Sequence, residues 1–146
     1  MARALDLHSK GHRFDSDILH KIFEMAHPNA HAESSAKKFG GKPEEYIHLH
    51  EWFDETKGWI GDTLHRMFRH HSEGIFELEK RFGTEFKNSE GKTVYVRYVG
   101  EQHVREDLYG YIPTAKEWLS NLQNKNKPEW MIRTIKMNDS ISNTNL

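Results

Sequence analysis

Residues 43–57, PEEYIHLHEWFDETK, open the longest helical region that the sequence predicts, from Glu44 to about Phe82. Pro43 suits the first turn of a helix, because the N–H that proline lacks would have no partner there. Four residues recur at steps of three and four and share one helical face: Tyr46, Leu49, His50 and Phe53. This spacing predicts an amphipathic helix.

A second apolar stripe continues the region toward Phe82. Its members follow the same steps of three and four: Ile60, Leu64, Met67, His71, Ile75, Leu78 and Phe82. Gly58 and Gly61 could bend or break the helix between the two stripes, since each costs about 1 kcal/mol relative to alanine in a helix interior.

Shorter elements flank this region. They are a first helix capped by Asp15 or Ser16 that is interrupted at His27-Pro28, a helix from Pro28 to Lys38 ended by Gly40-Gly41, strands at 84–86 and 93–99 joined by the turn 88–91, a short helix at 100–108, and a last helix capped by Thr114 with Glu117. These elements predict a mainly α (α+β) fold, a single-domain helical bundle with one small β-hairpin. The predicted division is an N-terminal extension with a possible helix (1–24), a His-rich metal-binding helical domain (25–132) and a disordered tail (133–146).

The overall charge limits the classes of partner. The chain has 146 residues, 29% of them charged, and a net charge of −1 with histidine neutral. Binding to nucleic acid in general needs a basic surface that neutralises phosphates, so it is not expected. A small-molecule or nucleotide substrate and assembly into a homo-oligomer both stay open.

The chain contains no cysteine, which excludes disulfides and thiolate metal sites. No stretch approaches the roughly 20 apolar residues of a membrane span, so no membrane contact is predicted. The first residues, MARALDLHSKGHRFDSD, lack the apolar segment of a secretory signal. A cytoplasmic location is therefore expected.

Eleven histidines are the most unusual feature of the composition. Inward-facing candidates lie on four separate predicted elements: His31, His50, His71 and His103. Burying four imidazoles separately would need four hydrogen-bond solutions, whereas one cation would satisfy them together. The pattern therefore predicts a divalent-metal site with zinc as the first candidate and manganese, iron or nickel as the others.

Local spacing leaves alternatives within this set. His27 and His31 are four apart and could chelate one ion, or His27 could cap the helix and His31 lie at the surface. Only one of the adjacent His70 and His71 can lie centrally on the inner face, and the stripe favours His71. The full set of predicted metal ligands is therefore His27, His31, His50, His70, His71 and His103.

Nearby carboxylates suggest further roles. Glu101 and Glu73 are the predicted catalytic residues, because each lies close in sequence to a candidate histidine and could move a proton. Asp54, one turn after His50, could orient that histidine. Glu106 and Asp107 are interpreted as surface charge.

From Met25 to Met131 the chain resembles an uncharacterised family of short bacterial and phage proteins, a domain of unknown function. The stretches that carry the resemblance are MAHPNAHAESSAKKFGGKPEEY, HEWFDETK, RHHSEGIFELEKRFG, NSEGKTVYVRYVGEQHVREDL, IPTAKEWL and PEWM. The resemblance implies that residues 1–24 are an addition, and its phage association implies an accessory or host-interaction role. It implies no reaction.

The sequence leaves three functional hypotheses. The first is a metal-dependent hydrolase acting on a phosphoester or nucleotide, in which the ion generates hydroxide and basic residues hold phosphate: Lys37, Lys38, Arg66 and Arg69. The alternative is a non-catalytic, metal-stabilised binding module of phage origin that interacts with a host or phage protein. The third is a domain without metal, whose histidines are core residues or pH sensors.

Overall fold

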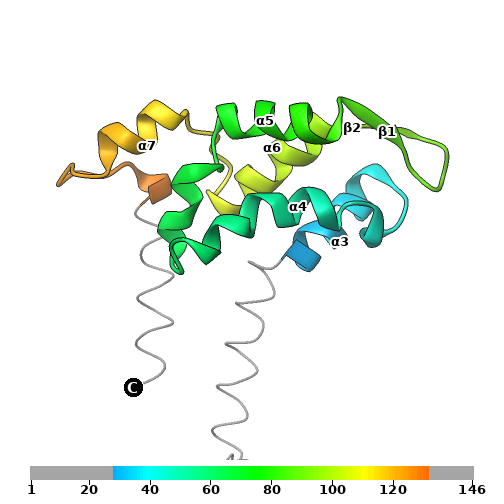
Figure 1. The fold of residues 1–146 in the computed structure, drawn as a ribbon, viewed down its shortest axis with the longest axis horizontal. Helices are drawn as coiled ribbons and strands as arrows, with labels where there is room; N and C mark the ends of the chain where they lie inside the picture. Colours follow the sequence, from blue (N-terminus) through cyan, green and yellow to red (C-terminus); the bar gives the residue numbers. More distant parts are fainter. Residues whose placement is uncertain (1–27, 132–146) are drawn as a thin grey trace, which may run out of the picture.

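A computed structural model describes residues 28–131, a set of packed helices with a two-stranded hairpin at one end (Figure 1). The elements in chain order are α3 (Pro28–Phe39), the 3₁₀ helix η1 (Pro43–Glu45), α4 (Ile47–Asp54), the 3₁₀ helices η2 (Glu55–Gly58) and η3 (Thr63–Phe68), α5 (Ser72–Phe82), β1 (Glu85–Lys87), β2 (Thr93–Tyr95), α6 (Val96–Asp107) and α7 (Ala115–Asn121). The predicted mainly helical fold with one antiparallel hairpin is confirmed.

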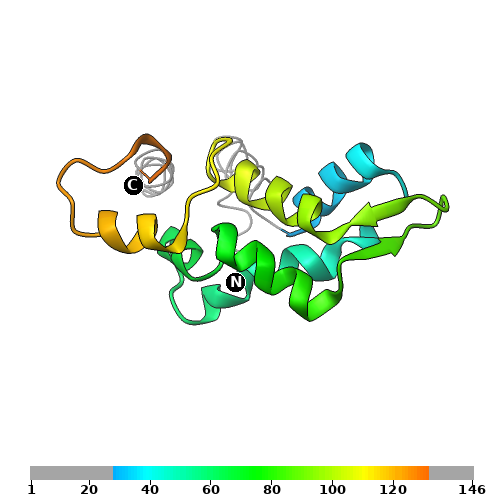
Figure 2. The same cartoon turned by 90° about the horizontal axis from the view of Figure 1, so that it is seen from above.

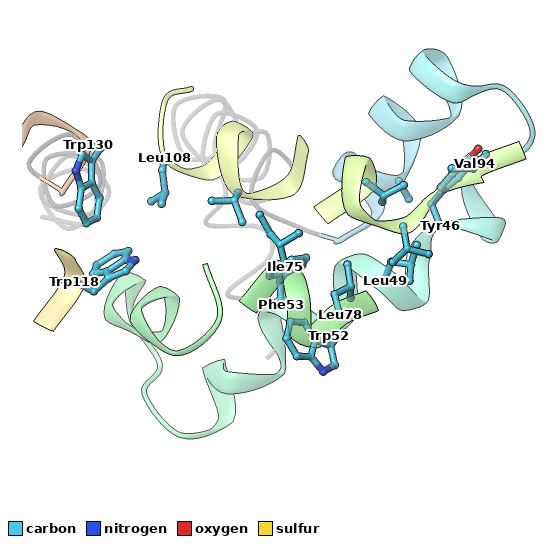
Figure 3. Packing of buried hydrophobic residues seen from close by; sticks show 14 of the residues in the cluster. Tyr46, Leu49, Trp52, Phe53, Ile75, Leu78, Val94, Leu108, Trp118 and Trp130 are labelled. Carbon is cyan, nitrogen blue, oxygen red and sulfur yellow. The ribbon is translucent and has the colours of Figure 1, made fainter. Parts of the chain in front are cut away.

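Helix α6 packs against α3, α4 and α5, and the hairpin and α7 lie at opposite ends of the molecule (Figure 2). The buried apolar side chains run along its length, from Tyr46 and Val94 near the hairpin to Trp118 and Trp130 beyond Leu108 (Figure 3). Large aromatic residues thus fill both ends of the core, which offsets a modest aliphatic content.

Three local predictions are confirmed. The predicted end of the helix at Gly40-Gly41 is found, because α3 ends at Phe39 and both glycines have positive φ. The hairpin turn lies between its strands where predicted, and Asn88 fixes it by accepting hydrogen bonds from the backbone of Glu90 and Lys92. The Thr114 side chain caps α7 by accepting from the Glu117 N–H at 3.1 Å.

The predicted second half of the long helix is wrong. The chain instead forms η3, which Asp62 caps by accepting from Leu64 N–H at 2.7 Å, and restarts as α5 at Ser72. His71 has extended backbone geometry and caps α5, accepting from Gly74 N–H through Nδ1 at 3.0 Å. Two capping side chains therefore divide a stripe whose spacing alone looks continuous.

The predicted strand 93–99 is too long. Strand β2 ends at Tyr95, and Val96 begins α6. The valines favour a strand by intrinsic preference. However, the buried residues follow helical spacing: Val96, Val99, Gly100, His103, Val104 and Asp107. Packing of this face against the other helices outweighs the local preference.

Gly74 allows the 69–71 turn to lie against α5. A Cβ at this position would overlap the backbone carbonyl of Arg69, which cannot move without displacing His70. We expect Gly74→Ala to destabilise the domain by about 1–3 kcal/mol, measured by urea unfolding. Gly58→Ala is the matched control, because nothing lies within 4 Å of its added Cβ. Equal unfolding midpoints for the two variants would contradict the expectation.

Several predictions lie outside the described residues: the first helix, His27, the division at residue 24 and the tail. Within residues 28–131, no helix is long and apolar enough to cross a membrane.

Candidate metal centre

Four buried side chains from three parts of the chain converge beside α6. Asp54 is the last residue of α4, His70 lies in the turn between η3 and α5, and His103 and Asp107 are one turn apart on α6. One ligand atom from each lies within 4.8 Å of all the others. The residues are between 0% and 8% exposed, so the group is enclosed by protein.

The spacing of these atoms matches a tetrahedral ion. His70 Nε2 lies 3.1 Å from His103 Nε2 and 2.9 Å from Asp107 Oδ2. The distance from His103 Nε2 to Asp107 Oδ2 is 3.2 Å, and Asp54 Oδ1 lies 3.7 Å from both imidazole atoms. Ligands about 2.0–2.1 Å from a tetrahedral ion are separated by about 3.4 Å, which falls within this range of distances.

Local contacts hold the two imidazoles in place. The His70 N–H donates to the Arg66 carbonyl at 2.8 Å, and the His70 carbonyl accepts from Trp118 Nε1 at 2.9 Å. The Phe53 ring stacks on the His103 ring, with centroids 4.5 Å apart. Core residues thus fix the orientation of the candidate ligands.

The protonation states suit metal binding. Burial alone would raise the pKa of Asp107, but Arg66 and His103 outweigh it and hold the pKa well below its usual value. Burial likewise opposes ionisation of Asp54, but the neighbouring histidines His103, His65 and His70 lower its pKa. Burial lowers the pKa of His70 to about 3, although Asp107 favours its protonation. The group therefore presents ionised carboxylates and a neutral imidazole at pH 7, the forms that bind metals.

Unpaired polar atoms are concentrated at this site. Asp54 Oδ2, Arg66 Nε and His70 Nδ1 are the buried side-chain atoms of residues 28–131 that have no hydrogen-bond partner. Lys57 Nζ approaches Asp54 Oδ2 only to 3.9 Å. None of the three is one of the converging donor atoms, so they show incomplete pairing around the group and not an empty ligand position.

Several positively charged side chains surround the carboxylates of the group. Burial lowers the pKa of His31, but hydrogen bonds from Nε2 to Asp107 and from Nδ1 to Glu106 raise it to about 9. Arg66 Nη2 lies 3.5 Å from Asp107 Oδ1. Lys57, half exposed, lies 3.9 Å from Asp54, so three cations face three carboxylates and the charges around the group are close to balance.

The structure brings together part of the predicted ligand set. His70 and His103 belong to the group, and His31 and His50 contact its members. His71 does not, because its Nε2 donates to the Phe68 carbonyl at 2.9 Å while its Nδ1 caps α5. The inner position that the stripe assigned to His71 is occupied by His70.

The two predicted catalytic carboxylates make their contacts elsewhere. Glu73 accepts from Ala115 N–H at 2.9 Å, at the beginning of α7. Glu101 pairs with Arg105 at 3.6 Å on α6. Their roles in proton transfer stay predictions.

The sequence did not identify the two aspartates as candidate ligands. The interpretation of Asp107 as surface charge is wrong, because the residue is 7% exposed and lies four residues after His103, on the same helical face. That spacing was the available signal. Asp54 was interpreted as a partner of His50, but its closest imidazole contact is His65 Nε2 at 3.4 Å.

His65 is a further histidine that the sequence did not single out. Its Nδ1 donates to the Asp62 carbonyl at 2.7 Å, so its Nε2 is directed at Asp54. A backbone carbonyl that orients an imidazole in this way is a common arrangement around metal ligands.

Together, the fold and the centre define a mainly helical domain with a buried His–Asp group that could hold a metal ion. The chain belongs to a domain family of unknown function, DUF6915, whose model matches residues 26–131. This match confirms the resemblance of the stretch from Met25 to Met131 to an uncharacterised family. No match was found among curated proteins or among solved structures.

Proposed function

We propose that this domain binds one divalent transition-metal ion through Asp54, His70, His103 and Asp107, and that the ion stabilises the packing of its helices. The observation that carries the proposal is the convergence of four buried donor atoms within 4.8 Å of one another. Two ionised carboxylates would neutralise the charge of the ion, and two imidazole nitrogens complete a set that suits zinc, manganese, iron or nickel.

Burial supports a stabilising role. Structural metal sites are closed by protein ligands, whereas catalytic sites keep a position open for water or substrate. All four donors are enclosed here, and they connect the end of α4, the start of α5 and the end of α6. An ion at this place would bind only the folded arrangement, so its binding energy would add to the stability of the fold.

In this role the domain would act by binding another protein, from a phage or its host. The proposed contact surface is the exposed aromatic pair Trp59 and Phe68. Their rings lie edge to face at 5.2 Å, and Trp59 is 68% exposed. Exposed tryptophan is typical of positions that dominate protein–protein binding.

Metal content tests the proposal directly. Protein purified without a polyhistidine tag should contain one equivalent of metal by elemental analysis. Saturation about 1,000-fold above the dissociation constant should add about 4 kcal/mol to the free energy of unfolding, or roughly 15 °C to Tm. Asp54→Asn should lose both the metal and the shift, while His48→Gln, an exposed histidine of α4, should keep them. Absence of metal, with no shift on adding zinc, manganese, iron or nickel, would overturn the proposal.

A metal-dependent phosphoester or nucleotide hydrolase is the second candidate. It is favoured by the donor chemistry, since structural zinc sites are usually rich in cysteine and sites with histidine and carboxylate ligands are usually catalytic. Arg66 adds support, because its buried Nε lacks a hydrogen-bond partner and a guanidinium can bind a phosphate oxygen. In this case the ion would supply a water of lowered pKa.

The same preparations separate the two roles. Metal-loaded wild type and Asp54→Asn would be compared on phosphodiester and nucleotide substrates. Turnover that requires the metal and disappears in the variant favours the hydrolase. Bound metal with the expected Tm shift and without turnover favours the stabilising role.

A further inference from the structure

Glu106 lies next to Asp107 and receives several hydrogen bonds. Burial raises its pKa, but His31 and Ser34 outweigh this effect and hold the pKa below its usual value, so the carboxylate is ionised. An ionised carboxylate can only accept hydrogen bonds. Gln102 must therefore direct its amide NH₂ toward Glu106 Oε1, 3.3 Å away.

This orientation of Gln102 determines the direction of the next contacts. Its carbonyl Oε1 faces Ser35 Oγ at 3.4 Å, and the Ser35 hydroxyl donates its proton there. Ser35 Oγ also lies 2.7 Å from His50 Nε2. Since the serine has only one proton to donate, His50 Nε2 must be the donor in this contact.

The donor and acceptor roles in the Ser35–His50 contact also fix those between His50 and His103. Burial keeps His50 neutral by lowering its pKa well below the usual value, so the proton on Nε2 leaves Nδ1 as an acceptor. His50 Nδ1 lies 2.9 Å from His103 Nδ1. The His103 nitrogen must therefore donate. A neutral His103 then carries no proton on Nε2, which lies 3.1 Å from His70 Nε2 and can accept a hydrogen bond from it.

We propose that Gln102, Ser35 and His50 form a directional hydrogen-bond chain, set by Glu106, that holds His103 in its Nδ1–H form and leaves Nε2 free to bind a metal. The purpose of the chain rests on the proposed metal site, but the tautomer itself is a property of the metal-free protein. His50, predicted as a ligand, is here a positioning residue. Helix α3 contributes to the centre through Ser35 without supplying a ligand.

The proposed hydrogen-bond chain explains how four polar side chains can be buried together at low energetic cost. The four residues whose donor and acceptor roles are fixed in this way are all buried: Ser35, His50, Gln102 and His103. A reversed direction would leave Gln102 Oε1 without its serine donor inside the protein, and an unsatisfied buried acceptor costs about 1–3 kcal/mol. Groups that orient metal-binding imidazoles in this way typically change metal affinity by about 10–100-fold when removed.

Nitrogen NMR of the imidazoles tests the proposal. In metal-free, ¹⁵N-labelled wild type, long-range ¹H–¹⁵N correlations should show His103 with Nδ1 protonated and Nε2 unprotonated. Ser35→Ala should produce a mixture of tautomers and weaken zinc binding by about 10–100-fold. Ser120→Ala is the control, because Ser120 is an exposed serine of α7 that makes no contact with the hydrogen-bond chain. It should retain the wild-type tautomer.

A second variant guards against misfolding of the first. Gln102→Met removes the acceptor at similar volume and should give the same mixture of tautomers. A wild-type His103 protonated at Nε2, or an Nδ1–H tautomer that is unchanged in both chain variants, would overturn the proposal. If His103 has the expected tautomer but the protein binds no metal, the proposed metal site is overturned and the proposed hydrogen-bond chain is supported.

Discussion

Asp107→Asn is expected to lower the free energy of unfolding by about 3–5 kcal/mol and to abolish stoichiometric metal binding. Asp107 is the most connected charge of the centre. Its carboxylate contacts four groups: His31 Nε2 at 3.1 Å, Arg66 Nη2 at 3.5 Å, His70 Nε2 at 2.9 Å and His103 Nε2 at 3.2 Å. Asparagine keeps the shape but leaves Arg66 and His31 without this counter-charge in a buried environment.

Urea unfolding of the metal-free protein measures the electrostatic part of this effect, and elemental analysis measures the metal. Glu77→Gln is the control, since Glu77 is exposed on α5 and its carboxylate lies 3.5 Å from the exposed Lys80 ammonium. A surface change of this kind should stay within about 0.5 kcal/mol of wild type. If Asp107→Asn also stays within that range, Asp107 does not balance the buried cations.

Raising the pH from 7 to about 10 is expected to remove roughly 3 kcal/mol of stability from the metal-free protein through His31. Glu106 and Asp107 outweigh the effect of burial and raise the pKa of His31 to about 9, against 6.5 in the unfolded chain. A raised pKa means that the folded state holds the proton more tightly. The contribution is therefore complete below pH 6.5 and is lost as the pH rises through 9.

The measurement is urea unfolding at intervals between pH 7 and 10, with a chelator present. His31→Gln should be less stable at pH 7 and should lack the extra loss of stability at alkaline pH. Lysine and tyrosine titrations are common to both proteins, so the difference between the two curves isolates His31. Parallel curves would show that His31 carries no proton at pH 7.

Sequence patterns predicted the elements whose ends carry strong local signals. The Gly40 helix end, the Asn88 turn and the Thr114 cap each act within a few residues, and each is found in the structure. The spacing of apolar residues predicted the elements less reliably where a segment fits two conformations and tertiary packing determines which one forms. Val96 and Val99 fit a strand as well as a helix until the neighbouring helices are in place.

The candidate site was predicted in part for a related reason. His70 and His103 were both among the predicted metal ligands. However, the choice between His70 and His71 assumed a continuous helix, which His71 interrupts by capping α5. Asp107 was interpreted as surface charge because it follows Arg105 and Glu106 in a stretch rich in charge. Its position four residues after His103, on the same helical face, was the available signal, and its contact with the distant Arg66 agrees with it.

The distribution of the four donors along the chain bears on the order of folding. His70 is 33 positions from His103 and 37 from Asp107, so no short segment can hold an ion by itself. Closing such loops costs entropy that only the docking of α4, α5 and α6 can offset. The metal would therefore be captured late, after the helices have met. Its effect would be expressed mainly as slower unfolding, because interactions absent from the transition state change the unfolding rate.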